Sequence, residues 1–185
     1  MKQVSLLTLV VIGGLLLVPL SLRLLKKEKS RLVYLWSLAS LYAGSVLYFT
    51  LFCRNVKEMV RFRLQPFITY KIAFSCLTGK GEFSKTDCYS VLRSSKNIFQ
   101  VTKNSPIEDC LLNITLFLPF GFFAGYLFKK TPLWKIVLYA LTFSICIELI
   151  QAIFHIGSCE TDDVLNNTLG TFLGWLLFRL SARHK

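Results

Sequence analysis

The sequence predicts an all-α integral membrane protein, a bundle of about five transmembrane helices with a long loop between the second and the third. Of the 185 residues, 54% are hydrophobic, and they gather in five runs, each near the roughly 20 residues that cross a bilayer core. The runs are apolar on every side instead of amphipathic, which indicates lipid around them. The basic residues behind the net charge of +12 lie mainly between the runs.

Each run is taken as one helix, and the first is expected to be retained. Lys2 alone precedes the apolar core and five Lys or Arg follow it, whereas a cleaved signal peptide carries its positive charges in front. Residues 1–53 would hold two helices, 54–109 an extracytoplasmic and partly interfacial loop, and 110–180 a core of three helices within a single domain. The predicted helices are Val4–Leu22, Leu32–Cys53, Cys110–Phe128 with Pro119 inside it, Leu133–Phe154 and Val164–Leu180.

The short connections predict the orientation. Residues 23–31 and 129–135 are rich in Lys and Arg, and so is the C-terminal tail, whereas 155–163 contains neither and carries three acidic residues. Lys and Arg favour the cytoplasmic side, so the N-terminus is expected outside and the C-terminus inside. The loop 54–109 would then lie outside although it is basic, and connections near 60 residues largely escape this rule.

Composition and motifs exclude several function classes. Basic residues between apolar runs fit topology signals and anionic headgroups, so membrane lipids are expected as partners and nucleic acid is not. The sequence shows no zinc spacing, P-loop, HExxH or nucleophile elbow, and no cofactor or metal is predicted. Cys76 and Cys88 could pair if their loop faces an oxidising compartment, or stay free.

Polar residues recur near the outer ends of the last three predicted helices. They would bind a polar ligand or headgroup, hold the bundle together, or divide acid and base roles in catalysis. Asp162 and Asp163 begin a helix, so either could be only a cap. The candidate ligand-binding residues are Asn113, Glu148, Gln151, Asp162, Asp163 and Asn167, with Asn166 adjacent.

Two GxxxG pairs predict that the third and fifth helices touch, because small residues let helix backbones approach closely in membranes. Gly121 and Gly125 share a face with Asn113 by steps of four. Gly170 and Gly174 share a face with Asn167.

These motifs resemble the core signature of the VanZ-like family of membrane proteins. The matching stretches are "NITLFLPFGFFAGYLF" (113–128), "IELIQAIF" (147–154) and "DDVLNNTLGTFLGWLL" (162–177), and "RLQPF" (63–67) resembles a further element. The sequence departs from the pattern at Arg63, where the family has Asn, and at Glu160, where Asp is usual. An Arg common before the acidic block is missing at Gly157 and Ser158.

The resemblance implies a multi-pass protein of the bacterial cell membrane that lowers susceptibility to lipoglycopeptides such as teicoplanin. It would bind or shield an envelope component at the outer leaflet, either a cell-wall precursor or the glycopeptide. One alternative is a membrane enzyme acting on a lipid-linked precursor, with Glu148 and Asp163 as catalytic candidates. The other is a non-catalytic assembly subunit. The sequence leans away from an enzyme and leaves the oligomeric state open.

Overall fold

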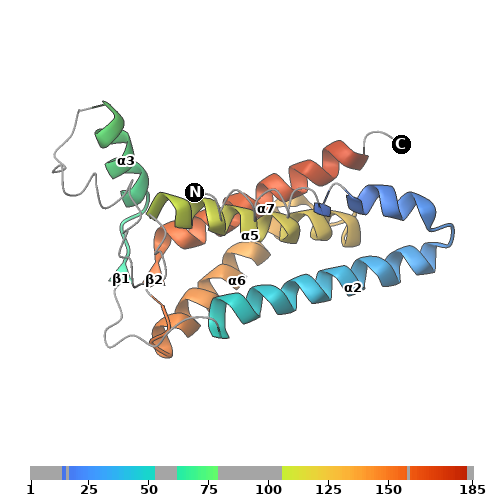
Figure 1. Cartoon of the computed structure of the whole chain (residues 1–185), viewed down its shortest axis with the longest axis horizontal. Helices are drawn as coiled ribbons and strands as arrows, with labels where there is room; N and C mark the ends of the chain where they lie inside the picture. The colour runs from blue at the N-terminus through green and yellow to red at the C-terminus, as the bar shows by residue number, and fades with distance from the viewer. Residues whose placement is uncertain (1–13, 16, 53–61, 79–105, 158, 183–185) are drawn as a thin grey trace, which may run out of the picture.

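The computed structural model describes residues 14–15, 17–52, 62–78, 106–157 and 159–182, and nearly all of them are helical. Residues 17–24 form a helical stretch ahead of the first labelled helix. The elements that follow are α2 (Glu28–Leu47), the π-helix η1 (Tyr48–Phe52), β1 (Phe62–Arg63), α3 (Ile68–Thr78), α5 (Pro106–Leu127), α6 (Leu133–Ile153), β2 (Cys159–Glu160) and α7 (Thr161–Ala182) (Figure 1).

Of the described helices, three are long and apolar enough to cross a membrane: Glu28–Phe52, Asp109–Leu127 and Leu133–Ile153. They correspond to the second, third and fourth predicted helices and confirm the all-α membrane class. The first predicted helix, Val4–Leu22, falls mostly outside the described residues. The fifth is present as α7, whose polar first two turns keep it out of these three. The count of five spans therefore stays a prediction.

The loop 54–109 is described only over residues 62–78 and from 106 onward. The helix that follows it begins earlier than predicted, at Pro106, since a proline fits the first helical position, where its N–H would have no partner. The same helix continues through Pro119 without a break. Cys53 and Cys88 lie outside the described residues, as does the side chain of Cys76, so their pairing stays open.

α7 lies between α5 and α6 and packs against both. Gly170 and Gly174 meet the backbone of α5 at Ile114 and Leu118. Because both contacts advance in the same direction along the two chains, α5 and α7 run parallel. Both therefore begin at the end of the bundle where α6 ends.

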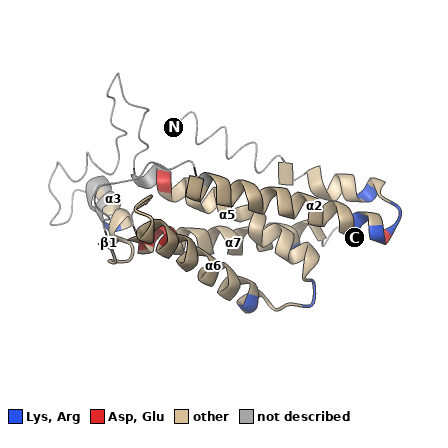
Figure 2. Cartoon of the chain, turned by 90° about the horizontal axis from the view of Figure 1, so that it is seen from below, with Lys and Arg blue, Asp and Glu red and all other residues tan. Residues whose placement is uncertain are grey.

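Charge separates along the bundle (Figure 2). We call the end where α6 finishes and α7 begins the acidic end. It carries Asp109, Glu148, Glu160, Asp162 and Asp163. The opposite, basic end carries most of the described cations, namely Arg23, Lys26, Lys27, Lys29, Arg31, Lys129, Lys130, Lys135 and Arg179.

Two short segments close the acidic end. β1 and β2 form a parallel pair in which Phe62 lies opposite Cys159 and Arg63 opposite Glu160. α3 follows β1 and lies beside the start of α5 and α7 (Figure 1). The chain before the core thus folds onto the turn between α6 and α7.

Candidate functional site

Polar side chains at the acidic end are buried within the protein instead of facing lipid. Ser144, Glu148 and Gln151 share one face of α6 by steps of four and three, and all are buried. From α7, Asp162, Asn166 and Asn167 are also buried, and Asp163 is half-buried. Polar groups in a membrane are stable where they face protein.

Asp162 caps the beginning of α3. Its Oδ1 accepts a hydrogen bond from the Phe67 N–H at 2.5 Å, and its Oδ2 accepts one from the Thr69 N–H at 3.1 Å. These donors belong to the N-terminal turn of a helix, which has no internal acceptors for them and favours a negative charge. Phe67 has a φ of 60°, which turns the chain into α3. Asp162 is therefore a helix cap. The sequence allowed this reading for the helix that Asp162 itself begins, whereas in the structure Asp162 caps α3, in the preceding loop.

Tyr70 ties α3 to α7 at a second point. Its hydroxyl donates to Oδ1 of Asn166 at 2.6 Å. Burial, followed by the proximity of Cys110 and Asp162, raises the pKa of Tyr70, so the hydroxyl keeps its proton and remains a donor. Sequence reasoning missed Tyr70, because nothing in the sequence of the loop indicated that it folds back onto α7.

Glu148 and Gln151 connect α6 to its surroundings. Glu148 Oε2 accepts a hydrogen bond from the Glu160 N–H at 3.0 Å, which holds β2 over the end of α6. Gln151 Nε2 donates to the Thr50 carbonyl of η1 at 2.9 Å. A Cβ at Gly157 would lie 2.6 Å from Gln151 Oε1, so a residue without a side chain lets the turn pass over the amide.

A second polar contact joins α6 and α7 one turn deeper. Asn167 Nδ2 donates to Ser144 Oγ at 2.8 Å. Since the two helices are antiparallel, Glu148 and Asp163 each lie one turn nearer the acidic end and face the same space. Burial first, and then the negative charges of Glu148, Asp163 and Glu160, raise the pKa of the Cys159 thiol. Glu148, Asp163 and Glu160 are therefore close enough to act on this thiol through their charge.

Three buried amide atoms in this region have no hydrogen-bond partner in the described part of the chain: Gln151 Oε1, Asn166 Nδ2 and Asn167 Oδ1. Their side chains are 1%, 2% and 5% exposed. Leaving such a group unpaired costs about 1–3 kcal/mol, and buried polar groups in native proteins nearly always have partners. Two acceptors and one donor thus remain available to a bound molecule or to water.

Asn113 belongs to the same level of the bundle but forms no hydrogen bond through its side chain to any described residue. It is half-buried on α5, one turn before Phe117. Phe117 packs against Ile147, and Gln151 follows Ile147 by one turn on α6. Asn113 is therefore near the level of Gln151, although no bond links the two.

All four predicted packing glycines lie at the contact between α5 and α7. A Cβ at Gly121 would overlap the Thr171 carbonyl, and one at Gly125 would overlap the Phe178 ring. Gly170 and Gly174 leave equally little room toward α5. These close approaches bring the polar turns of α7 beside the start of α5.

The described residues offer no group of three or more His, Cys, Asp or Glu side chains arranged to hold a metal ion. Cys110, Cys146 and Cys159 are free thiols. His155 is exposed and, with a φ of 58°, lies in the turn after α6. Amides and carboxylates, with the hydroxyls of Tyr70 and Ser144, thus provide the chemistry of the site.

Residues 39–182 match the family model described as VanZ/LLP1. A curated relative, Protein VanZ of Enterococcus faecium, is 30% identical over 105 residues, which cover 57% of this chain and 65% of the relative. The chain thus aligns with somewhat less than two thirds of that relative. No solved structure matches. Because the family model covers most of the chain, including all of the acidic-end residues described above, the protein belongs to the VanZ/LLP1 family.

Proposed function

We propose that the protein binds a polar component of the bacterial cell envelope at its acidic end and thereby lowers susceptibility to lipoglycopeptides such as teicoplanin. The observation that carries this proposal is the set of three buried amide atoms without partners, on Gln151, Asn166 and Asn167. A ligand that supplies two donors and one acceptor would satisfy all three. A lipid-linked precursor headgroup or the drug itself has such groups.

The proposed orientation places the acidic end at the outer leaflet, with the N-terminus outside and the C-terminus in the cytoplasm. The collection of Lys and Arg at the opposite end of the bundle supports it (Figure 2), since cytoplasmic ends carry such an excess. The site would then face the compartment in which cell-wall precursors and glycopeptides meet.

The segment of β1 and α3 supports a position at the membrane surface. Phe62, Leu64, Phe67 and Phe74 are all exposed, as is Lys71. Aromatic and aliphatic groups beside a cation are typical of segments that lie in the headgroup layer. In this arrangement α3 covers the polar site from the outer side, so a headgroup would approach it from beneath α3.

The proposal is tested by expressing the chain in a susceptible strain and measuring the minimum inhibitory concentrations of teicoplanin and vancomycin. We expect protection against teicoplanin, and its loss in Gln151→Ala and Asn166→Ala at unchanged amounts of folded membrane protein. Thr142→Ala is the matched control, because Thr142 is exposed on α6 and bonds only within its helix, to the Leu138 carbonyl. Equal susceptibility with and without the wild-type chain would refute the resistance role.

The same variants separate binding from the purely structural reading, in which the polar contacts only hold the bundle together. That reading predicts that Gln151→Ala reduces the amount of folded protein, since the variant loses the bond to Thr50. Fluorescence-detected size-exclusion chromatography measures this amount directly.

A membrane enzyme is the second candidate, favoured by Glu148 and Asp163 facing one space from adjacent helices. Glu148→Gln keeps an oxygen that can accept the Glu160 N–H, but it removes the charge. If the carboxylate acts as an acid or base, this variant abolishes protection while its thermal stability stays near that of the wild type. Unchanged protection would exclude a catalytic role for Glu148.

A further inference from the structure

The contact between α6 and α7 at the acidic end contains an oxygen acceptor that lacks a donor. Asn167 Nδ2 donates to Ser144 Oγ at 2.8 Å. Because the two polar atoms of Asn167 belong to one planar carboxamide, its Oδ1 also lies between these helices. This oxygen has no hydrogen-bond partner in the described part of the chain, although Asn167 is only 5% exposed. The position is therefore prepared for a donor from a bound molecule.

Two carboxylates lie one turn nearer the acidic end on the same two helix faces. Glu148 follows Ser144 by four residues on α6, and Asp163 precedes Asn167 by four on α7. Burial first, and then the charges of Glu148 and Asp163, raise the pKa of the Cys159 thiol, so both carboxylates are close to this thiol. Glu148 is buried, whereas Asp163 is half-buried and can be reached from the acidic end. With Asn167 Oδ1 they form a set of three oxygen acceptors.

The surroundings of this set favour a positively charged donor. A carboxylate has about four lone-pair sites, so it can keep its existing contacts, such as the bond from the Glu160 N–H to Glu148, and accept a further donor. Lys71 and His155 are the basic residues of this end whose side chains the structure describes. Both are exposed, so neither lies between α6 and α7. A donor that reaches Asn167 Oδ1 thus enters a negative environment.

The number and type of the acceptors select the chemical group. A primary ammonium has three N–H donors and no acceptor, which matches three oxygens, two of them on carboxylates. A quaternary ammonium has the charge but no N–H. Ca²⁺ and Mg²⁺ require about six or more oxygen ligands, and no three His, Cys, Asp or Glu side chains among the described residues are arranged to hold a metal ion.

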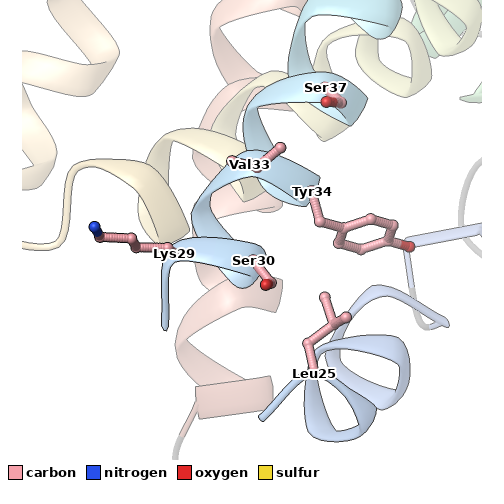
Figure 3. Close-up of a pocket in the computed structure, with 6 residues that line it drawn as sticks. All are labelled: Leu25, Lys29, Ser30, Val33, Tyr34 and Ser37. Carbon is pink, nitrogen blue, oxygen red and sulfur yellow. The ribbon is translucent and has the colours of Figure 1, made fainter. Parts of the chain in front are cut away.

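A groove at the basic end lacks these features. It has a volume of about 490 Å³, and its lining contains no carboxylate. The Lys29 ammonium, the one charge among the lining residues, points away from the groove (Figure 3). The lining residues are Leu25, Lys29, Ser30, Val33, Tyr34 and Ser37. An amine therefore finds its acceptors at the acidic end and not in this groove.

We propose that the ligand of the acidic end carries a primary ammonium group, whose N–H donors contact Asn167 Oδ1, Glu148 and Asp163. Gln151 lies about 4.5 Å further along α6 than Glu148, and its unpartnered Oε1 accepts a second donor of the same ligand. This assignment rests on the function proposed above, since it names the chemistry that the envelope component brings to the site. The ammonium belongs either to a phospholipid headgroup or to a free amine.

The test is native mass spectrometry of the purified full chain in detergent, titrated with phosphatidylethanolamine, its N-methyl and N,N-dimethyl forms, and phosphatidylcholine. These lipids have the same net charge, but the N–H donors decrease along the series until none remains. We expect affinity to fall by about tenfold or more from the first lipid to the last, because one hydrogen bond to a charged group contributes at least that factor. Equal binding of all four lipids overturns the proposal.

O-phosphoethanolamine and phosphocholine repeat the comparison without acyl chains. Preferential binding of O-phosphoethanolamine supports the proposal and shows that a free amine suffices. Preference for phosphatidylethanolamine alone supports it and assigns the ammonium to a lipid headgroup. Failure of both primary amines to bind overturns the proposal.

Glu148→Gln should weaken phosphatidylethanolamine binding about tenfold, because the charge is lost while an oxygen remains. Asp163→Asn, at a half-buried position, tests the second charge and replaces Glu148→Gln if that variant does not fold. Glu28→Gln is the matched control, since Glu28 is exposed at the start of α2, at the opposite end. Equal weakening by Glu148→Gln and Glu28→Gln overturns the proposal. Displacement of the lipid by Ca²⁺, but not by Na⁺ at the same ionic strength, assigns a metal ion and also overturns it.

The outcome is separable from that of the susceptibility test. A chain that protects against teicoplanin but binds the four lipids equally keeps the proposed function and loses the ammonium assignment. A chain that prefers phosphatidylethanolamine without protecting keeps the ammonium assignment and loses the resistance role.

Discussion

Removing the carboxylate of Asp162 should release α3 from the bundle. In Asp162→Ala the N–H groups of Phe67 and Thr69 lose their shared acceptor inside the protein. Hydrogen bonds to charged groups contribute about 1.5–3 kcal/mol each, so the attachment of α3 weakens by about 3–6 kcal/mol. Because water can satisfy the two donors only if the helix moves away, we expect local detachment and an intact core.

Hydrogen exchange measured by mass spectrometry reports this detachment. Every 1.4 kcal/mol changes an equilibrium tenfold, so a loss of about 3 kcal/mol speeds exchange of the α3 amides by about 100-fold, provided that they exchange through local opening. Amides of α5 and α7 should keep their wild-type rates. Asp162→Asn retains one acceptor oxygen, so its α3 amides should exchange at a rate between those of the wild type and of Asp162→Ala. Wild-type exchange of α3 in Asp162→Ala would refute the claim that this carboxylate holds the helix.

Two further predictions concern packing and charge. Gly174→Ala should lower the melting temperature, because its Cβ would overlap the Leu118 carbonyl. The control Gly44→Ala meets nothing within 4 Å and should be neutral or stabilising by up to about 1 kcal/mol. Equal effects of the two substitutions would contradict close packing at Gly174. Since only the thiolate reacts, the raised pKa of Cys159 should slow its alkylation by iodoacetamide at pH 8. Glu148→Gln removes a neighbouring negative charge, so the pKa should fall and site-resolved alkylation should become faster; an unchanged pH profile would place Glu148 away from the thiol.

The helices could be predicted because their signal is local. With η1 counted as the continuation of α2, the second through fifth predicted helices begin and end within four residues of those in the structure. A run of about 20 apolar residues is recognisable without knowing its neighbours. The packing role of the glycine pairs could also be predicted, because spacing alone puts Gly170 and Gly174 on one face of the helix. The count of membrane crossings was harder, because α7 combines an apolar half with a polar one.

The partners of the polar residues could not be predicted, because they come from distant parts of the chain. Tyr70 precedes Asn166 by 96 positions, and Thr50 precedes Gln151 by 101. Tyr70 belongs to a loop with no strong helical signal, and Thr50 contributes a backbone carbonyl, whose partner no residue type can indicate. Ser144 looked like an ordinary small residue in an apolar run, and only the antiparallel packing of α6 and α7 gives it a role.

The polar start of α7 is explained by what surrounds it. A charged side chain near the bilayer centre costs roughly 2.5–3.5 kcal/mol, yet Asp162 bonds to α3 and Asn167 to α6. From Gly170 onward the helix is mainly apolar and fits against α5 at its glycines. The stability of α7 in a membrane therefore depends on α3, α5 and α6 being in place. A helix stabilised by its neighbours can retain the unpaired amides that a separate span would have to avoid, and this is why the candidate site lies on α7 and the facing turns of α6.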